Sequence, residues 1–410
     1  MTTGLTQDDW YRVTLSDATR PDAPIGYGIV QPGPNTQGGV PVVAIRDLPR
    51  PSMAKLHRSA PAIEAAYRRS RVAGDDLLVS VKGTTGRIGL VPKGFRGNIS
   101  RDVARIRLRA EHDPEFWFQL LQSSEAQQTL KKAAVGSTRQ ELSIWTFRSL
   151  LFAVPGRVEQ QAIAARLMDT DSLISTFERL IAKKQAIKEG MMQQLLTGRT
   201  RLPGYARPWR DLHAGDVGYF KGGSGFPVCH QGAASGKFPF FKVSDMNKAG
   251  NQLFMTSANN YISEPQRKQI GAIVMPTGAI VFAKVGAAVF LERKRILAQP
   301  SCIDNNMAAF MPDASSADVR FVYYVLTNFP MASLVATGAL PSLNGRQLRS
   351  IPLSMPTDLD EQRALARVLT DADAEIDVLR TRVDKARAAK IGVMQELLTG
   401  RTRLPVEATS

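Results

Sequence analysis

Loops that combine basic and small polar residues are the parts of this sequence best suited to chemistry, and that chemistry is contact with phosphates and base edges. In the first part of the chain they include the glycine-rich stretch 83–89 and a loop near residue 140. Lys and Arg suit phosphate oxygens, whereas Arg, Asn, Gln, Ser and Thr can hydrogen bond to base edges. The candidate contacts here are Lys82, Thr84, Thr85, Arg87, Lys93, Arg96, Arg101, Ser137, Thr138, Arg139 and Gln140.

A second set of loops with the same composition lies in the later part of the chain. Each basic residue taken singly also fits a solvated surface. The stretch 83–89 also fits a plain turn after a strand, and Asn305-Asn306 also fits a buried turn. The candidate contacts in this second set are Lys221, Lys242, Lys284, Asn305, Ser342, Asn344 and Arg346.

The distribution of charge favours binding over mere solvation. The 410 residues include 53 Lys and Arg against 37 Asp and Glu, a formal net charge of +16. Residues 1–150 hold 21 basic and 14 acidic residues and residues 204–355 hold 15 and 8, so each region carries +7. Residues 159–203 and 361–405 carry only +2 each. The sequence therefore predicts a polyanionic partner, nucleic acid above all, that is gripped at two places.

The sequence signatures of common catalytic sites are missing. The chain has no G-x-x-x-x-G-K-[ST] motif for ATP, and no second motif for methyl transfer follows the glycine-rich Phe220–Gly225. The four His and two Cys have neither metal-ligand spacing nor the number for a disulfide framework, and two Cys fit a reducing cytosol. The chain also lacks a run of about 18 apolar residues that could span a membrane. We therefore expect a cytoplasmic, non-catalytic chain without a metal or cofactor of its own.

An internal repeat organises the chain. The segment LLTGRTRLP occurs at Leu195–Pro203 and again at Leu397–Pro405, an offset of 202 residues. The same offset aligns 159–203 with 361–405, with 23 identities over 45 positions. Because this period is far too long for a solenoid, it indicates duplication of half a protein.

Both repeated segments are predicted to be helices of roughly 40 residues, about 60 Å long. Their apolar residues recur at spacings of three, four and seven, which predicts a narrow seam, and Leu173, Leu180 and Ile187 are expected to widen the first one. Two matched seams favour pairing of the helices over each helix lying on its own domain. Gly190 and Gly392 are expected to permit a close helix approach or a bend. The predicted seam consists of Leu167, Ile174, Phe177, Ile181, Leu369, Ile376, Leu379 and Val383.

The two helices alternate with two heads of mixed α/β character. We expect a first head at 1–158, a helix at 159–203, a second head at 204–360, a helix at 361–405 and a tail at 406–410. Each head is expected to open with a tryptophan element (Trp10–Asp17, Trp209–Asp216) and to close with a short strand to Pro155 or Pro356. Comparable inner strands are predicted at 41–45 and 76–81, and at 238–243 and 279–284.

This order resembles the specificity subunit of type I restriction–modification systems. The helix starts Glu159-Gln160-Gln161 and Asp360-Glu361-Gln362-Arg363, with LLTGRTRL at the helix ends, are typical of that family. The stretches Phe240–Met246 and Thr337–Asn344 are also similar to sequences typical of that family, whereas Val135–Leu142 in the first head departs from the typical sequence. The resemblance covers essentially the whole chain.

The resemblance implies a non-catalytic DNA reader. Its fold would be two target recognition domains on an antiparallel coiled coil with pseudo-two-fold symmetry, and each domain would read one half of a bipartite site. The implied partners are double-stranded DNA and two modification subunits, which bind S-adenosylmethionine and methylate adenine. Two restriction subunits, which use ATP and Mg²⁺, are optional further partners. The alternatives are a DNA-binding coiled-coil scaffold without sequence readout, and the fused recognition part of a methyltransferase or nuclease.

Overall fold

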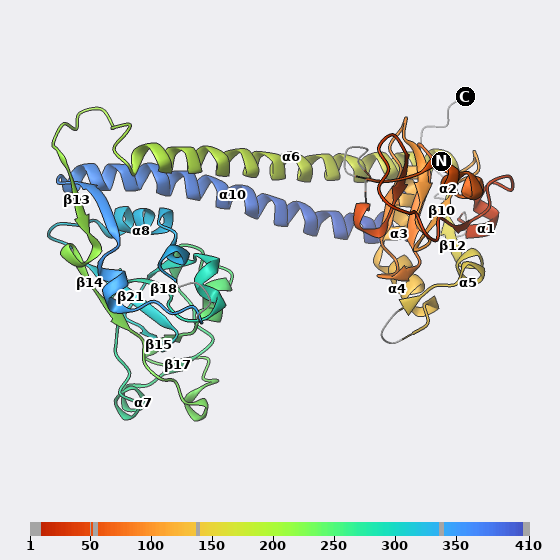
Figure 1. Ribbon diagram of the computed structural model, residues 1–410. Helices are drawn as coiled ribbons and strands as arrows, with labels where there is room; N and C mark the ends of the chain where they lie inside the picture. Colours follow the sequence, from red (N-terminus) through yellow and green to blue (C-terminus); the bar gives the residue numbers. More distant parts are fainter. Residues whose placement is uncertain (1–9, 50, 52–55, 137–139, 336–339, 405–410) are drawn as a thin grey trace, which may run out of the picture. The chain divides into compact units, whose positions relative to one another are not determined.

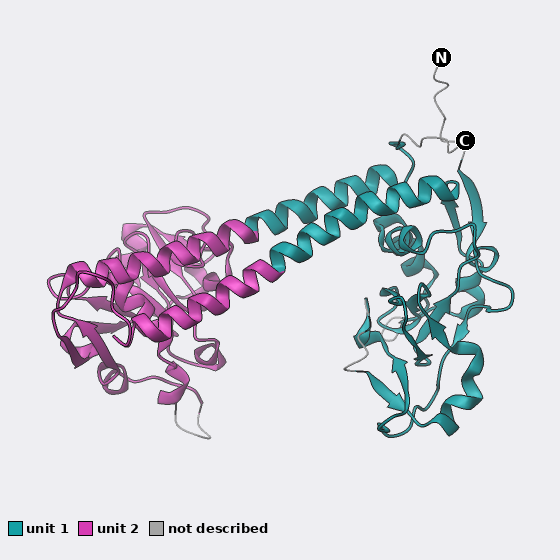
Figure 2. Ribbon diagram, turned by 90° about the horizontal axis from the view of Figure 1, so that it is seen from above, with its two compact units in different colours: residues 1–178, 381–410 teal, residues 179–380 magenta. Residues whose placement is uncertain are grey.

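The structure, a computed structural model, describes residues 10–404 except for 50, 52–55, 137–139 and 336–339 (Figure 1). The chain forms two compact units, residues 1–178 with 381–410 and residues 179–380 (Figure 2). Each unit contains one head and one part of each of two long helices, α6 (Arg157–Leu195) and α10 (Leu359–Leu397). Within the described residues, every helix is too short or too polar to cross a membrane.

The head of the first unit consists of small sheets packed with short helices. One sheet has the strand order β2–β10–β6–β8, a second has the order β4–β3–β9–β5, and β11–β7 and β1–β12 form two-stranded pairs. The strands are β1 Tyr11–Thr14, β2 Gly26–Tyr27, β3 Val40–Val43, β4 His57–Ser59, β5 Val72–Ala73, β6 Leu77–Ser80, β7 Lys82–Gly83, β8 Ile88–Leu90, β9 Arg96–Ile99, β10 Val103–Ile106, β11 Gln140–Glu141 and β12 Leu151–Val154. The helices are α1 Leu15–Ala18, α2 Pro61–Glu64, α3 Pro114–Gln122, α4 Ser124–Ala133 and α5 Ile144–Arg148.

The head of the second unit repeats this plan. Its sheets have the strand orders β14–β21–β18–β19–β16, β17–β15–β20 and β13–β22. The strands are β13 Trp209–His213, β14 Gly218–Gly222, β15 Phe238–Phe241, β16 Phe254–Met255, β17 Tyr261–Ile262, β18 Ile280–Ala283, β19 Lys294–Leu297, β20 Cys302–Ile303, β21 Met307–Pro312 and β22 Pro352–Pro356. The helices are α7 Glu264–Gln269, α8 Val319–Asn328 and α9 Gly345–Arg349.

The two heads agree in pairing as well as in strand order. In the first, β10 pairs antiparallel with β6 and β3 pairs parallel with β9; in the second, β21 and β18, and β15 and β20, pair in the same ways. The Asp that follows the first inner strand has the same role in both heads. Asp47 accepts a hydrogen bond from the Ala44 N–H at 2.8 Å, and Asp245 accepts one from the Lys242 N–H at 2.7 Å. These carboxylates close the turns after β3 and β15, which is why a strand followed by Asp recurs in the sequence.

The sequence predictions for the heads are confirmed at the level of elements. The strands predicted at 41–45, 76–81, 238–243 and 279–284 correspond to β3, β6, β15 and β18, with bounds that differ by at most two residues. β6 and β18 are buried along their whole length, as their unbroken apolar runs require. The tryptophan elements form β1 and β13, and they pair with the closing strands β12 and β22.

Both long helices are confirmed, and they end earlier than the repeated segments. Each has 39 residues and ends at Leu195 or Leu397 rather than near Pro203 or Pro405. The chain turns because Gly198 and Gly400 adopt φ angles of +68° and +72°, which non-glycine residues rarely reach. A Cβ on Gly198 would lie 3.2 Å from the Trp209 ring, and one on Gly400 would lie 3.4 Å from the Trp10 ring. In each copy the repeated LLTGR sequence thus ends the helix, and its glycine turn packs against the tryptophan at which a head begins.

Within each unit the parts of α6 and α10 run antiparallel and are tied by equivalent ion pairs. In the first unit Lys390 donates to Asp171 at 2.7 Å, and in the second Lys188 donates to Asp373 at 2.6 Å. Both pairs join the same two positions of the 202-residue repeat with the helices exchanged. Glu159–Arg403 at 2.6 Å and Glu361–Arg201 at 2.5 Å repeat in the same way. The duplicated sequence therefore produces the same ion pairs between the helices in each of the two units.

The predicted seam is partly a helix–helix seam and partly head core. Leu167 and Leu369 are fully buried and belong to the cores of the first and second heads. Farther along, Ile376, Leu379 and Val383 are at most 7% exposed, and Ile174, Phe177 and Ile181 are half-buried. Both arrangements considered from the sequence therefore occur, each along a different part of the helices.

One expectation about the helices is wrong, and a second is wrong for one of its two alternatives. Leu173, Leu180 and Ile187 do not widen the seam, because they are 47%, 38% and 47% exposed. Leu173 and Leu180 directly precede the half-buried Ile174 and Ile181, and Ile187 precedes Lys188, which donates to Asp373. One residue turns a side chain by about 100° around a helix. Gly190 and Gly392 do not serve a close helix approach, because a Cβ at either position would meet no atom within 4 Å. A bend at these glycines stays a prediction.

Removal of Glu361 should destabilise the second unit strongly. Glu361 is fully buried and accepts hydrogen bonds from Arg201 at 2.9 and 2.5 Å and from the Trp209 indole at 3.3 Å. We expect Glu361→Ala to cost about 2–3 kcal/mol, because Arg201 then keeps its charge in a largely buried place without a partner. The neighbouring Asp360→Ala removes an exposed ion pair with Arg363 and should cost less than about 1 kcal/mol. Urea unfolding of the two full-length variants measures the difference, and equal losses would contradict the assignment.

Candidate nucleic-acid interface

In the first head the structure brings the two predicted loops together. β7 pairs with β11, so that Gly83 lies opposite Gln140 and Lys82 opposite Glu141. The Thr85 hydroxyl lies 3.2 Å from the Gln140 amide oxygen, to which it donates. Arg101 joins this group, because the Val81 N–H donates to the carbonyl of the adjacent Asp102. The glycine-rich loop, strand β11 with Gln140 and the turn at Arg101 therefore lie together.

Lys82 is positioned within this surface by two contacts. Its ammonium group lies 2.8 Å from Glu141 and 5.0 Å from the centroid of the Tyr27 ring. The hydrogen bond that Lys82 donates to Glu141 raises the pKa of Lys82, although partial burial opposes the shift. Lys82 therefore keeps its charge through the neutral range and is available to a phosphate.

The other predicted residues of the first head divide between two ends of the sheet. Thr84 and Arg87 are exposed in the glycine-rich loop, and Arg87 donates to the Leu48 carbonyl at 3.2 Å. Lys93 and Arg96 are exposed beyond the other end of β8, so the structure does not place them with Lys82. Their contact with DNA stays a prediction, as does that of Ser137, Thr138 and Arg139, which lie outside the described residues.

In the second head the predicted segments converge around Lys284. The Lys284 N–H donates to the Asn306 carbonyl at 2.8 Å, and its own carbonyl accepts from the Leu343 N–H at 2.8 Å. The Lys284 ammonium lies over Gly222, where a Cβ would approach it to 2.9 Å. These contacts bring together the segments that carry Lys221, Lys284, Asn305 and Ser342. Lys221, Asn305 and Ser342 are exposed, and Lys284 is half-buried.

Lys242 adjoins the same group through Asp304. The Asp304 N–H donates to the Phe241 carbonyl at 2.9 Å, and the Lys242 ammonium donates to the Gln231 amide oxygen at 3.1 Å. Burial raises the pKa of Asp304, whereas hydrogen bonds from Asn306 and the charge of Lys242 oppose the rise. A surface of this kind, which carries several lysines and is partly shielded from solvent, suits a polyanion.

Two residues of the predicted set begin helix α9. Asn344 is its N-cap, and its side-chain oxygen accepts from the N–H groups of Arg346 and Gln347 at 3.0 Å. The Asn344 oxygen is therefore engaged in capping, while Arg346 is exposed at the start of the helix. The loop residues that precede Leu340 lie outside the described part of the chain.

The structure adds residues that the sequence analysis missed. Trp145 is 82% exposed in α5, two residues after the N-cap Ser143, which is the place that Arg346 has after the N-cap Asn344 in α9. Gln127, Gln128 and Lys131 of α4 line a cavity of about 230 Å³ together with Thr85, Gly86 and Gln140. The polar residues at 127–129 and 131–132, on either side of the buried Leu130, were a usable signal, but they lie far from the glycine-rich loop in sequence.

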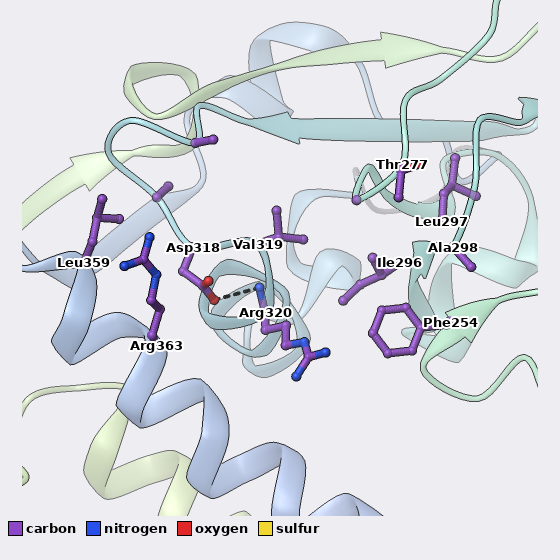
Figure 3. Close-up of a pocket in the computed structure, with 13 residues that line it drawn as sticks. Phe254, Thr277, Ile296, Leu297, Ala298, Asp318, Val319, Arg320, Leu359 and Arg363 are labelled. Carbon is purple, nitrogen blue, oxygen red and sulfur yellow. Dashed lines mark hydrogen bonds between the residues drawn. The ribbon is translucent and has the colours of Figure 1, made fainter.

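A cavity of about 530 Å³ lies in the second unit, away from these loops (Figure 3). Its walls include Phe254, Ile296 and Leu297, and the starts of α8 and α10 close it. Its charged side chains have structural partners. The Asp318 carboxylate caps α8, Arg320 lies 5.6 Å from the centroid of the Phe254 ring, and Arg363 donates to Asp360 at 3.0 Å. None of the predicted DNA contacts lines this cavity.

Cys302 is buried in β20, and burial raises the pKa of its thiol to about 11. The thiolate, which is the reactive form, is therefore scarce at neutral pH.

Together, two equivalent heads with convergent basic loops, joined by duplicated helices, define a two-headed protein adapted to a polyanion. The chain belongs to the type I restriction modification DNA specificity domain family, whose model matches residues 34–189 and again residues 207–386. Each match covers most of one head and the greater part of the helix that follows. The family resemblance inferred from the sequence is thereby confirmed.

Characterised relatives support this assignment. The chain is 26% identical over 195 residues to the type I restriction enzyme EcoBI specificity subunit of Escherichia coli, and the match covers 47% of this chain and 41% of that protein. It is 22% identical over 351 residues to the type I restriction enzyme MjaVIII specificity subunit of Methanocaldococcus jannaschii, with 80% of each chain covered. The chain thus matches less than half the length of the first relative and most of the second.

Solved structures share the fold. A type I restriction–modification S subunit from M. genitalium aligns with a TM-score of 0.59 and 16% identity over 95% of this chain and 96% of its own. A chain from a type I R-M system, described for complex assembly and conformational transition, aligns with a TM-score of 0.58 and 19% identity over 96% and 98%. At these identities the likeness establishes the fold, namely two mixed α/β recognition domains with long helices.

Proposed function

We propose that this chain is the DNA specificity subunit of a type I restriction–modification complex, and that it recognises a bipartite site in double-stranded DNA with one head for each half-site. The observation that carries the proposal is the convergence of equivalent loops in both heads, around Lys82 in one and Lys284 in the other. Because the helices stayed alike while the heads diverged, the two half-sites should differ. The alternatives, a scaffold without sequence readout and a fused part of a methyltransferase or nuclease, do not call for two separate reading surfaces.

The long helices are proposed to dock modification subunits and, where present, restriction subunits. Large apolar side chains are exposed on both helices: Leu173, Leu180 and Ile187 on α6, and Val378 and Ile391 on α10. Exposed apolar residues at a spacing of seven suit an amphipathic partner helix. S-adenosylmethionine, ATP and Mg²⁺ would then act on the partner subunits, in the cytoplasm, and this chain would supply none of them.

Reconstitution tests the proposal. The purified chain alone should not methylate or cleave DNA, and addition of the modification subunit with S-adenosylmethionine should give adenine methylation. Sequencing of methylated adenines in cells with and without this chain should then reveal one bipartite motif that depends on it. Methyl transfer by the lone chain, or methylation of the same motif in its absence, would refute the assignment.

Neutralisation of Lys284 should weaken DNA binding in a salt-dependent way. We expect Lys284→Gln to reduce affinity for all duplexes alike and to lower the slope of log K against log salt concentration by about one, because one phosphate contact is lost. Lys268→Gln removes an exposed lysine from α7, at the opposite end of β15 from Lys242, and should change neither quantity. Fluorescence anisotropy at several salt concentrations measures both variants, and an unchanged slope for Lys284→Gln would contradict the contact.

A further inference from the structure

Two large apolar side chains stand exposed on a turn in the second head. The connection between β18 and β19 contains a single short turn, Ala287–Leu291, and Phe290 and Leu291 at its end are each 54% exposed. In the first head the equivalent connection between β6 and β8 consists of residues 81–87, which are Val, Lys, Gly, Thr, Thr, Gly and Arg. The heads therefore differ here in chemistry, polar in the first and apolar in the second.

The turn is held by an ion pair between the half-buried Glu292 and the buried Lys294. Glu292, which follows Leu291, adopts the left-handed conformation with φ +52°, a strained place for a residue other than glycine. Its carboxylate accepts hydrogen bonds from the Met331 N–H at 3.0 Å, from the Ala332 N–H at 2.7 Å and from Lys294. Lys294 is only 1% exposed and also donates to the Phe329 carbonyl at 3.1 Å. The turn is thus fixed to β19 and to the segment at 329–332.

The same turn adjoins the candidate DNA surface. The Gly286 N–H donates to the Pro341 carbonyl at 2.8 Å, and Val285 forms a bridge with Ser342. Leu340, beside Pro341, is itself 76% exposed. Lys284, which precedes the turn, is the residue around which the basic segments of this head converge. Phe290 and Leu291 therefore belong to a connection that begins at Lys284 and pairs with the segment of Pro341 and Ser342.

A strained turn that exposes two large apolar side chains calls for a partner, since water is a poor environment for them. The basic residues of the adjoining candidate DNA surface indicate which partner. Proteins that contact DNA phosphates with basic residues often insert an apolar side chain between base pairs, which unstacks one step and bends the duplex. A side chain that is already fixed loses little conformational entropy on insertion, so a rigid turn suits this role.

We propose that Phe290 and Leu291 form an apolar wedge that enters duplex DNA at the half-site read by the second head and unstacks one base step there. This inference rests on the proposed function, because it assumes that the second head contacts DNA. The wedge would favour a flexible step, such as TA or CA, where unstacking costs least. It would thus contribute specificity at a step that no hydrogen bond reads.

Selection from a randomised duplex library tests the wedge. The full chain, assembled with its modification subunits, should enrich one bipartite motif. The double variant Phe290→Ala/Leu291→Ala should enrich the same first half-site, lose the preference at one step of the second, and bind the original duplex about 10- to 100-fold more weakly. The control Val228→Ala removes a side chain that is 83% exposed in the same head and should behave as the parent chain.

A spectroscopic arm reports unstacking directly. With 2-aminopurine placed at successive positions of the selected second half-site, the parent complex should raise the fluorescence at one step, and the double variant should not. Enrichment of an unchanged motif with unchanged affinity by the double variant, or absence of any fluorescence rise in the parent, overturns the wedge. Loss of modification subunits from the double variant also overturns it, because the two side chains would then bind protein. Failure of the parent chain to enrich any motif would instead refute the proposed function.

Discussion

Exchange of residues 1–158 for the first head of another family member should replace one half of the methylated motif completely and leave the other half unchanged. Every hydrophobic core cluster is built from residues of a single unit, two clusters in the first unit and three in the second, so a new first head need not disturb the second. The junction also spares Glu159, which with Arg403 ties the start of α6 to the turn after α10. The measurement is the motif obtained by sequencing methylated adenines in cells that carry the chimera.

The donor head must meet one requirement. The first core includes Ile163, Ala164 and Leu167 from α6 and Leu397 and Leu398 from α10, so the donor has to accept these side chains. A reciprocal chimera that exchanges residues 204–360 serves as the matched control and should change the other half-site. A chimera that altered both halves, or one that folded and altered neither, would contradict one reader per half-site.

Much of the fold could be predicted because the duplication shows the same helical sequence pattern twice in the chain. The 202-residue offset identifies both helices, and its conserved acids and bases turn out to be the ion pairs Asp171–Lys390 and Asp373–Lys188. What repetition cannot reveal is the direction in which a helical residue faces. Leu173, Leu180 and Ile187 have the spacing of a seam, yet they face solvent, because spacing fixes a row of side chains without fixing what covers it.

The candidate site could be predicted less completely. Lys82, Thr85 and Gln140 come together because β7 pairs with β11, a contact between segments more than fifty residues apart. Lys93 and Arg96 were predicted as contacts on their residue type alone. In the structure they lie beyond the opposite end of β8 from the glycine-rich loop, which the sequence does not indicate. Trp145 was missed because an isolated Trp near an apolar strand reads as core, whereas the structure leaves it exposed.

Lengthening both long helices should change the spacer between the half-sites. α6 passes from the first unit to the second after Glu178, and α10 returns after Arg380, so both connections have to grow together. Four added residues in each helix extend it by about 6 Å and turn it about 40° beyond a full turn. One base pair adds about 3.4 Å and about 35° of twist, so the added rotation matches one pair and the added rise nearly two.

We therefore expect four helix-forming residues, such as Ala-Glu-Leu-Lys, inserted after Glu178 and after Arg380 to leave both half-sites unchanged and to lengthen the spacer by one or two base pairs. An insertion of four residues, known as a stutter, locally unwinds a coiled coil, and the apolar side chains can still face the partner helix. As a control, the same four residues inserted between Pro203 and Gly204, after the end of α6, should leave the spacer as it was. Sequencing of methylated adenines distinguishes the outcomes. An unchanged spacer in the helix variant, or a broad mixture of spacers, would mean that helix length does not determine the distance between the half-sites.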